Sequence, residues 1–447
     1  MSRRSIDVLV IGAGAAGLAA ARQLSHAGLD AAVIEARSRI GGRIFTIHDP
    51  NSPLPIELGA EFVHGEPEQL LNVIQAAKLI LDVLPDNHHS SHKGIFSPIP
   101  DFWKRLGKLS EGIGRTVHRN QKDISFLQYL DRSHLPRAKR ELLLNFVEGF
   151  QAADPDEISA RSLADGAEEL LSGYKQFHVT SGYDGVVNWL RAGINPDRID
   201  IRLNTTVTEL KWKRGTVIMR SVNAAGAALD SFDAKAAIIT IPNALLKNKS
   251  IRMTPELPEK YGAADKLGAG QVFKMILQFH NSFWEEDEFI SKRLKKNSSL
   301  DELNFIHAQD EDVPVWWTAS PSRAPTLTAW AGGPKGESLL AEDRQSQIDR
   351  TLASLARVFG TPRKVIDELL VGAASHDWRS DTFSRCAYSY VSVGGMSAAH
   401  ALAKPVDGTL FFAGEATDLE EMGTVAGAIA SGKRAAHECI RVLAKRS

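Results

Sequence analysis

A short segment near the N-terminus places the strongest constraint on how this chain can fold. Residues 6–11 form an apolar run rich in β-branched side chains, which predicts a buried strand. The run continues into G-A-G-A-A-G at residues 12–17 and then into an alanine-rich segment that ends at Gly28. Strand, glycine turn and helix in this order are the context that a dinucleotide-binding fingerprint requires.

The residues of this fingerprint have separate physical tasks. We expect Gly12 to make the tight turn, Gly14 to let the backbone approach a pyrophosphate, and Gly17 to let the helix pack on the strand. The N–H groups of the helix N-terminus would then face the phosphates, where the helix dipole favours negative charge. The candidate cofactor-binding residues here are Gly12, Gly14, Ala16 and Gly17.

The next predicted strand, residues 31–34, ends in an acid followed by arginines. Glu35 comes about 18 residues after Gly17, close to the spacing of about 20 at which an acid holds the ribose hydroxyls of a dinucleotide. The following residues continue as E-A-R-x-R-x-G-G-R up to Arg43, a second glycine turn flanked by arginines. The planar fork of arginine suits phosphate, although a solvated basic loop is the simpler alternative.

As a unit, the segment from Glu35 to Arg43 resembles the FAD-binding segment of the flavin amine oxidase family. This family includes monoamine oxidases, polyamine oxidases and the lysine-specific histone demethylases. NAD is the alternative dinucleotide. The resemblance implies FAD contacts at Glu35, Ala36, Arg37, Gly42 and Arg43.

Two further motifs extend the resemblance over nearly the full length. Residues 53–65 contain E-L-G-A-x-x-V-H-G, which is similar to the family segment that passes the flavin ring. Residues 408–443 contain F-F-A-G-E-x-T and G-T-V-x-G-A-x-x-S-G, similar to the C-terminal FAD motif, whose helix N-terminus can stabilise charge on the flavin. The further cofactor contacts implied are Gly59, Ala60, Glu61, Val207, Trp378, Gly414, Glu415, Thr424 and Val425. Without the resemblance, Val207 is only a strand residue and Trp378 a core tryptophan.

Composition narrows the class of protein. The chain has 447 residues, 43% of them hydrophobic, and a formal charge of −1, which is typical of a globular protein long enough for two domains and gives no support for nucleic-acid or membrane-surface partners. Cys386 and Cys439 are too few for a disulfide framework, as in a reducing compartment. The first apolar run is the predicted strand of the cofactor fold, so we do not expect it to be a signal peptide. No apolar run in the sequence is long enough to span a bilayer. We expect a cytoplasmic protein without a membrane partner.

We predict an α/β fold: a Rossmann-like FAD-binding domain with an inserted α+β substrate-binding domain, and a cavity at their junction. The FAD-binding domain takes residues 1–82, 176–251 and 373–447, and the substrate-binding domain residues 83–175 and 252–372. Helices are expected at 66–81, 101–119, 135–152, 159–172, 255–267 and 342–358. Strands are expected at 198–203, 206–213, 215–222, 234–240, 271–280, 313–320 and 326–331.

Residues 86–94 hold three histidines, and His88 and His92 have the spacing of a helical metal pair. The polar residues around them argue against a helix, and no acid or cysteine completes a ligand set with these histidines. We therefore predict a solvated loop and no metal site.

Lys274 and His64 are the candidate catalytic residues. Strand alternation puts Lys274 on one face with Val272 and Ile276, where an ammonium needs a partner or must reach water at the sheet rim. The strand pattern alone does not decide between a paired lysine and one that reaches water. The motif G-A-G-x-x-x-K resembles the family position whose lysine holds a water molecule against flavin N5. His64 resembles the polyamine oxidase histidine that contacts substrate, and an ordinary polar residue is the alternative. Glu61 and Glu66 could attract a cationic amine or be solvated.

Cys386 occupies the place where monoamine oxidases carry their flavin-linked cysteine. The two positions that hold the aromatic pair of those enzymes are Ala387 and Thr424 here, so the pair is absent. A covalent link through Cys386 is possible but not favoured, and Thr424 is similar to polyamine oxidases and histone demethylases.

The resemblance implies FAD-dependent oxidation of a small-molecule amine, with polyamine-like substrates favoured. Hydride would pass to flavin N5, the imine would hydrolyse, and O2 would reoxidise the flavin to give H2O2. One alternative is an L-amino-acid oxidase, which needs a cation for the carboxylate where this chain has Glu61 and Phe62. A desaturase is disfavoured by Lys274 and the V-H-G turn. A flavoprotein with structural FAD and a partner-binding surface is the third alternative; the oligomeric state is not predicted.

Overall fold

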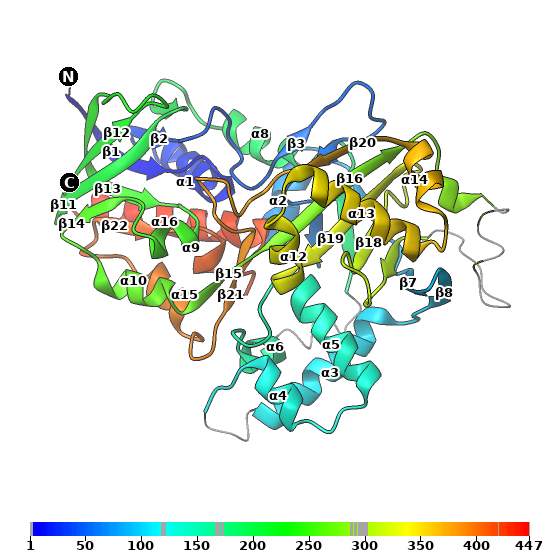
Figure 1. Ribbon diagram of the computed structural model, residues 1–447. Helices are drawn as coiled ribbons and strands as arrows, with labels where there is room; N and C mark the ends of the chain where they lie inside the picture. Colours follow the sequence, from blue (N-terminus) through cyan, green and yellow to red (C-terminus); the bar gives the residue numbers. More distant parts are fainter. Residues whose placement is uncertain are drawn as a thin grey trace.

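The computed structural model describes residues 3–117, 122–165, 171, 174–286, 289, 293, 303–418 and 420–446. Two large sheets dominate these residues, one of eight strands and one of seven. Figure 1 shows the eight-stranded sheet on the side of both chain termini, the seven-stranded sheet on the opposite side, and a helical region, residues 102–165, below them.

The eight-stranded sheet is built around the fingerprint strand. Its order is β10-β2-β1-β13-β12-β11-β14, with β22 also paired to β13. The central strands β2, β1, β13 and β22 run parallel and are largely buried, as expected for a sheet covered on both faces. The strands are β1 (Arg3–Ile11), β2 (Ala31–Ile34), β10 (Ile199–Arg202), β11 (Thr206–Lys213), β12 (Thr216–Val222), β13 (Ser231–Ile239), β14 (Arg252–Thr254) and β22 (Leu410–Phe412).

Helices rich in small residues cover this sheet. On one face α1 (Ala15–His26) packs directly against α16 (Val425–Ala444), with α8 (Asp184–Ala192) beside them. A side chain at Gly432 of α16 would stand 2.2 Å from the carbonyl of Ala16, so the two helices can be this close only with glycine there. The opposite face is covered by α9 (Asn243–Lys247), α10 (Pro258–Ala264) and α15 (Ala398–Ala403).

The seven-stranded sheet carries the predicted lysine strand. Its order is β20-β16-β19-β18-β17-β7-β8, and helices α12 (Gly333–Leu340), α13 (Arg344–Val358) and α14 (Arg363–Leu369) belong to the same part of the chain. Its strands are β7 (His88–His92), β8 (Ile95–Pro98), β16 (Val272–Phe279), β17 (Phe305–His307), β18 (Val315–Thr318), β19 (Thr326–Gly332) and β20 (Leu370–Ser375).

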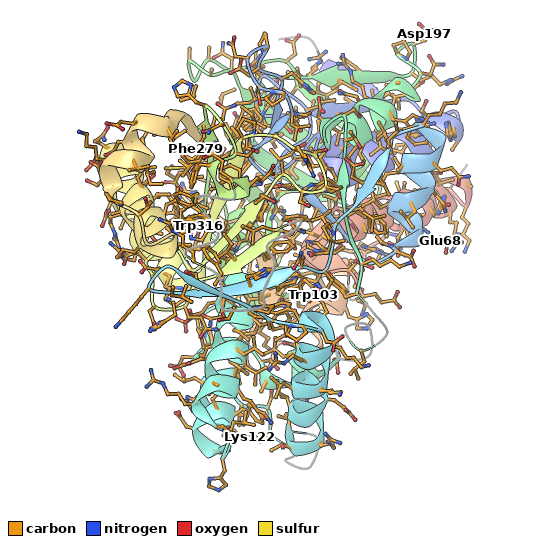
Figure 2. The ribbon with its side chains drawn as sticks, turned by 90° about the vertical axis from the view of Figure 1, so that its right-hand side faces the viewer. Glu68, Trp103, Lys122, Asp197, Phe279 and Trp316 are labelled. Atoms are coloured by element: carbon orange, nitrogen blue, oxygen red, sulfur yellow. The ribbon has the colours of Figure 1, made fainter. Side chains whose placement is uncertain are left out.

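The first insertion is mainly helical, as predicted. Its helices are α3 (Phe102–Val117), α4 (Phe126–Arg132), α5 (Arg137–Gly149) and α6 (Ala160–Asp165). They enclose a core of their own, and Figure 2 shows Trp103 where this region meets the sheets and Lys122 at its far end. Part of the helix predicted at 159–172, residues 166–170 and 172, lies outside the described residues.

Short elements join these parts. They are β3 (Thr46–Ile47), β4 (Ile56–Glu57), β5 (Phe62–His64), β6 (Leu81–Val83), β9 (Gln176–Val179), β15 (Leu267–Gly270), β21 (Tyr388–Val391), α2 (Glu68–Ala76) and two 3-10 turns, Phe283–Glu285 and Glu415–Thr417. In the described ranges no helix is both long and apolar enough to cross a membrane. β14 extends the first sheet past residue 251, and β20 belongs to the second sheet across residue 373, so the sheets do not divide at the two domain boundaries we predicted there.

Two predictions for the first hundred residues are wrong. The helix predicted at 66–81 is shorter and is followed by strand β6, which pairs with β9. The predicted solvated loop at 86–94 contains strand β7, held between β17 and β8, and His88 and His89 are buried. Long-range strand pairing and aromatic neighbours explain the difference, because neither is visible in the polar local sequence.

Candidate active site

A large cavity of about 1190 Å³ brings the predicted site residues together. It is lined by the loops after the parallel strands β1, β2, β13 and β22, where ligands bind in open α/β sheets, and also by residues of β5, β16, β17 and the helical region. The predicted residues that line it are Gly12, Gly14, Ala16, Glu35, Ala36, Arg37, Gly42, Arg43, Gly59, Ala60, Glu61, His64, Val207, Lys274, Trp378, Gly414, Glu415, Thr424 and Val425.

Gly17 is the one predicted cofactor-binding residue that does not line the cavity. A β-carbon at Gly17 would stand 1.9 Å from the carbonyl oxygen of Gly12, so a larger residue would push helix α1 away from the turn. Gly17 therefore serves helix packing and not ligand contact. Gly12 makes the turn itself, with a φ of +104° that favours glycine.

Gly14 has different surroundings. It is the N-cap of α1, it lines the cavity, and a β-carbon there would meet no protein atom closer than 3.9 Å. The protein's own packing does not require a glycine at this position. Since α1 has neither a side-chain cap nor an acid in its first turn, its N-terminus can receive an anion.

Glu35 and Arg37 lie beside this turn. The buried Glu35 carboxylate accepts hydrogen bonds from the backbone N–H of Ala13 and of Arg37, both at 2.8 Å, which leaves one lone pair on each oxygen for ribose hydroxyls. The Arg37 guanidinium forms an ion pair with Asp381 and donates to Ser384 at 3.0 Å. Asp381 and Ser384 carried no motif that could have identified them from the sequence.

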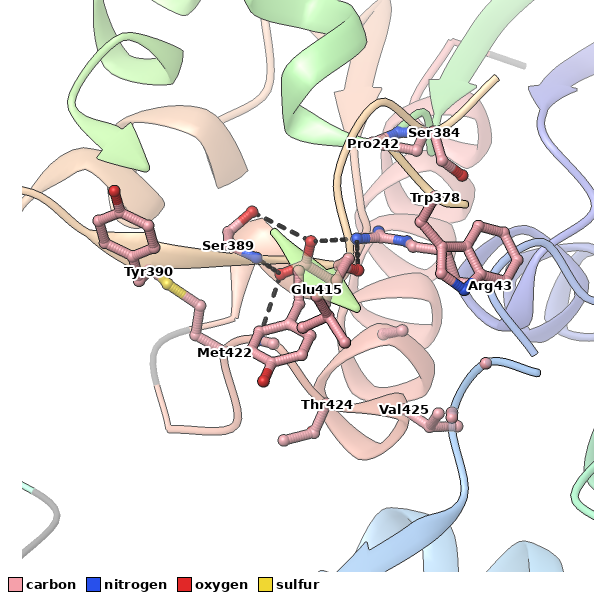
Figure 3. A pocket seen from close by; sticks show the side chains of 18 of the residues that line it. Arg43, Pro242, Trp378, Ser384, Ser389, Tyr390, Glu415, Met422, Thr424 and Val425 are labelled. Carbon is pink, nitrogen blue, oxygen red and sulfur yellow. Dashed lines mark hydrogen bonds and ion pairs between the residues drawn. The ribbon is translucent and has the colours of Figure 1, made fainter. Parts of the chain in front are cut away.

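On the cavity wall across from Glu35 and Arg37, the Glu415 carboxylate accepts several hydrogen bonds. Figure 3 shows it between Ser389 and Arg43, with contacts to both. Arg43 donates to Glu415 at 2.9 Å and to the Ala387 carbonyl at 2.8 Å, while the Ser389 hydroxyl and the Gly423 N–H donate to the carboxylate at 3.0 and 3.2 Å. This network fixes the turn that leads into α16.

The N-terminus of α16 also faces the cavity. Thr424 caps the helix by accepting a hydrogen bond from Gly427 N–H at 3.0 Å, and Val425 and Ala426 line the cavity beyond it. The first turn of α16 contains no acid, so its dipole can stabilise negative charge on a ligand. Trp378 is buried near the same wall and donates its indole N–H to the Leu58 carbonyl at 3.0 Å.

Lys274 forms a buried ion pair that the sequence did not predict. Its ammonium lies 2.6 Å from Glu61 and donates to the Gly59 carbonyl at 3.1 Å; the residue is only 5% exposed, so it does not reach bulk water at a sheet rim. The other Glu61 oxygen receives the indole N–H of Trp317 at 2.9 Å and lies 3.3 Å from His178. Burial alone would raise the pKa of Glu61, but the charge of Lys274 and the hydrogen bond from His178 outweigh burial and lower that pKa to about 2.

His64 lies in the cavity on β5. Burial lowers its pKa to about 4, so the ring is neutral at pH 7. Its Nδ1 is 3.2 Å from the Gln176 amide, and Phe150 and Tyr174 pack around the ring. Glu66, by contrast, is exposed and pairs with Lys175.

Cys386 does not line the cavity, although its neighbours Arg385 and Ala387 do. It is completely buried, and burial raises the pKa of its thiol. Tyr388, which we did not predict, lines the cavity and donates its hydroxyl to the Phe150 carbonyl at 2.8 Å. Within the part of the chain that the structure describes, no group of three or more histidine, cysteine or acidic residues could hold a metal ion.

These features fit a dinucleotide. The cavity has two helix N-termini free of acids, a glycine whose side-chain space is open, and a buried carboxylate with spare acceptors. The N-terminus of α1 and the open space at Gly14 suit the pyrophosphate, the Glu35 carboxylate suits the ribose, and the N-terminus of α16 suits negative charge on the flavin of FAD.

Comparison with known proteins agrees with this geometry. The family model described as flavin containing amine oxidoreductase matches residues 15–440. Polyamine oxidase 2 of Arabidopsis thaliana is 33% identical over 99% of this chain and 90% of that protein, and lysine-specific histone demethylase 2 of Homo sapiens is 27% identical over 96% and 53%.

Solved structures show the same fold. Wild-type putrescine oxidase bound to putrescine has a TM-score of 0.80 at 21% identity and covers 98% of this chain and 100% of that one. Cyclohexylamine oxidase from Brevibacterium oxydans IH-35A has a TM-score of 0.79 at 21% identity, covering 98% and 99%. The predicted fold class is confirmed. The chain belongs to the flavin-containing amine oxidoreductase family and is an FAD-dependent amine oxidoreductase.

Proposed function

We propose that this enzyme oxidises an amine with no carboxylate beside the reacting carbon, and that polyamines or their derivatives are favoured over aryl monoamines. The observation that carries the proposal is the chemistry of the cavity wall. Its only lysine among the described residues is the paired Lys274, and its arginines are Arg37, Arg43 and Arg385. Arg37 and Arg43 already pair with Asp381 and Glu415.

Aromatic side chains line the part of the cavity around His64. They suit the methylene chain of an aliphatic amine, and their faces attract a cation. These residues are Phe62, Trp103, Phe150, Tyr174, Phe305, Trp317 and Trp330. The family relative named polyamine oxidase 2 supports the same substrate class.

FAD, when bound, supplies the two-electron step: it accepts a hydride from the carbon next to the amine nitrogen, and O2 takes the electrons to give H2O2. The chain's part is to position the amine and to handle protons. An ammonium has three N–H donors, and Lys274 uses two of them on Glu61 and Gly59. The third N–H donor is available to hold a water molecule. The ion pair with Glu61 keeps the Lys274 ammonium oriented for this contact.

Hydride loss needs the nitrogen lone pair, so the amine must react in its neutral form. An ammonium with a pKa near 10.4 is neutral in on the order of one molecule in a few thousand at pH 7. His64 is neutral at this pH and so adds no positive charge that would repel the substrate. We propose that His64 contacts the amine chain and orients its reacting carbon.

An L-amino-acid oxidase is the second candidate. It needs a free cation for the substrate carboxylate, and two of the three cavity arginines are already paired. Arg385 is the remaining candidate, and its replacement by methionine would abolish amino-acid oxidation if it served this role.

The test is a peroxide-release screen of primary amines, polyamines and amino acids, followed by anaerobic mixing with the best substrate. We expect the yellow colour to bleach rapidly with a polyamine. If an α-amino acid is the best substrate, the specificity proposal fails. If no amine bleaches the flavin, the catalytic proposal fails and the third alternative, a structural FAD with a partner-binding surface, gains support. Acid precipitation decides the covalent link, and we expect all colour to stay in the supernatant.

A further inference from the structure

A chain of three polar side chains runs from the protein surface into the cavity on the side of the seven-stranded sheet. Asp86, whose side chain is 48% exposed, has its carboxylate 3.2 Å from Nε2 of His88. Nδ1 of His88 lies 2.9 Å from Nε2 of His307. We call His88 and His307 the histidine dyad; both residues line the cavity.

Strand register explains how two residues so distant in sequence meet. In the parallel pair β7·β17, Phe305 is opposite His88, and His307 is two residues further along. Residues two apart share a face of the sheet, so His88, Phe305 and His307 all point to the cavity side, while His89 points to the other face. The Phe102 ring stacks on His88 at 4.0 Å and on His307 at 4.7 Å, which holds both rings in place.

The hydrogen-bond partners of the two rings determine which of their nitrogen atoms carry a proton. A carboxylate only accepts hydrogen bonds, so Asp86 favours a proton on Nε2 of His88 and leaves its Nδ1 as an acceptor. His307 must then donate from Nε2, and its own Nδ1 becomes an acceptor. Among the residues that the structure describes, none forms a hydrogen bond with Nδ1 of His307. The dyad therefore ends in an acceptor backed by a negative charge.

Neither ring of the dyad carries a positive charge at pH 7 that would repel a cationic ligand. Burial lowers the pKa of His88, an effect opposed by Asp86, and burial holds the pKa of His307 well below its usual value, helped by repulsion from His88 and His89. Both rings are thus neutral at pH 7. A neutral acceptor with a carboxylate behind it suits the N–H groups of a cationic amine.

Aromatic rings connect this point to the reacting end. Trp317, which donates to Glu61 beside Lys274, is 6.2 Å from Phe305 between ring centroids, and Phe305 is 4.7 Å from His88. A methylene chain could lie along these rings with one nitrogen near Lys274 and the other at the dyad.

We propose that the Asp86–His88–His307 chain is the binding subsite for the second, non-reacting nitrogen of a linear diamine or polyamine, with Nδ1 of His307 as the acceptor. Asp86 and His88 act as positioning residues. The inference rests on the proposed amine oxidation and names the part of the substrate that this region selects.

The test compares His307→Phe with wild type on linear diamines and on n-alkylamines of the same length. Phenylalanine keeps a flat ring against Phe102 but removes the acceptor. We expect kcat/KM for the diamine to fall about 10- to 100-fold, the range for a hydrogen bond to a charged group, and to fall much less for the monoamine. Calorimetry on the holoenzyme with a linear diguanidine, which donates N–H groups but is not an amine substrate, should show the same loss of affinity.

Two further variants keep the result interpretable. His92→Phe removes another histidine from β7 whose ring is 70% exposed and pairs with Asp310, and it should leave both substrates unaffected. Asp86→Asn changes a half-exposed side chain and should give a smaller loss with the same preference for the diamine. If His307→Phe does not fold, the Asp86→Asn ratio of diamine to monoamine decides.

Equal losses for diamine and monoamine, or no loss for either, would overturn the proposal. So would a wild-type enzyme that oxidises both with equal kcat/KM. A wild-type enzyme that oxidises no amine would instead overturn the proposed function, and diguanidine binding would still report on the dyad.

Discussion

At the dinucleotide end of the cavity the protein presents mainly backbone: the turn at Gly12, the open N-cap at Gly14 and the N-terminus of α16. At the amine end it presents side chains in pairs, among them Lys274 with Glu61 and His88 with His307. The first set comes from two short segments at the ends of the chain. The second set is assembled from strands that are far apart in sequence.

This difference has a physical origin. A phosphate is recognised by backbone N–H groups, which the N-terminus of any helix provides. The sequence must therefore only supply small residues there, so that the backbone stays accessible. An ammonium inside a protein must be offset by a specific carboxylate at close range, because burial of an unpaired charge is costly. The amine end should therefore be sensitive to the loss of a side-chain partner, and the dinucleotide end to any side chain that blocks access to its backbone.

The largest effect is expected at the dinucleotide end, from Gly14→Val. The protein leaves room for the side chain, so the fold should persist while backbone approach to the pyrophosphate is blocked. We expect complete loss of bound FAD, measured as visible absorbance after purification, with an unchanged far-UV circular dichroism spectrum. Gly262→Ala, on an exposed helical position with open space, is the matched control and should stay yellow. A yellow Gly14→Val protein would contradict this account.

At the amine end, Lys274→Met should retain FAD and slow turnover by about 10²–10⁴-fold, the usual range for a positioned proton-transfer group. Stopped-flow absorbance would follow flavin reduction by the amine and reoxidation by O2 separately. We expect at least one of the two steps to carry the loss. Wild-type rates in both would leave Lys274 a structural residue only.

The ion pair should be coupled in stability. Lys274→Met leaves a buried carboxylate without its ammonium, and Glu61→Gln leaves the ammonium without its carboxylate, so each should lower the free energy of unfolding by about 3–5 kcal/mol. The double variant should lose less than the sum, because it buries no unpaired charge. Urea unfolding of all four proteins measures the coupling, and additive losses would show that the pair does not interact.

His64 should make stability depend on pH. Its pKa is about 4 in the folded protein and 6.5 in the unfolded chain, so between these values the unfolded state binds the extra proton and stability falls as pH decreases. At pH 5.5 this costs about 1 kcal/mol. His64→Gln removes that titration, and its free energy of unfolding should therefore fall less than that of wild type between pH 7 and pH 5. Parallel profiles would place the protonated ring in contact with water.

The smallest effect is expected at the α16 cap. Thr424→Val removes the hydroxyl that accepts from Gly427 N–H, at a typical cost of about 1 kcal/mol. Thr424→Ser retains the hydroxyl and should be close to wild type. Chemical denaturation of the holoenzyme would distinguish them, and equal stability of the two variants would show that the cap is not needed.

Local sequence was sufficient for much of the fold. The strand, glycine turn, helix and acid of the first 43 residues predicted β1, α1, β2 and the position of Glu35, because each depends on contacts between near neighbours in the chain. Period-two alternation likewise predicted β16 and placed Lys274 on one face with Val272 and Ile276, but it left open whether the ammonium is paired inside the protein or reaches water.

Tertiary structure alone decided which side chains meet. The partners of Lys274 and Arg37, namely Glu61 and Asp381, come from distant segments and leave no local pattern. The polar run around His88 resembled a loop, yet it is a strand with His88 and His89 buried, because β17 and β8 satisfy its backbone and Phe102 and Phe305 stack on the His88 ring. A backbone turn is specified by residues that adjoin it, whereas a buried charge or ring is specified by whichever strand the fold brings alongside.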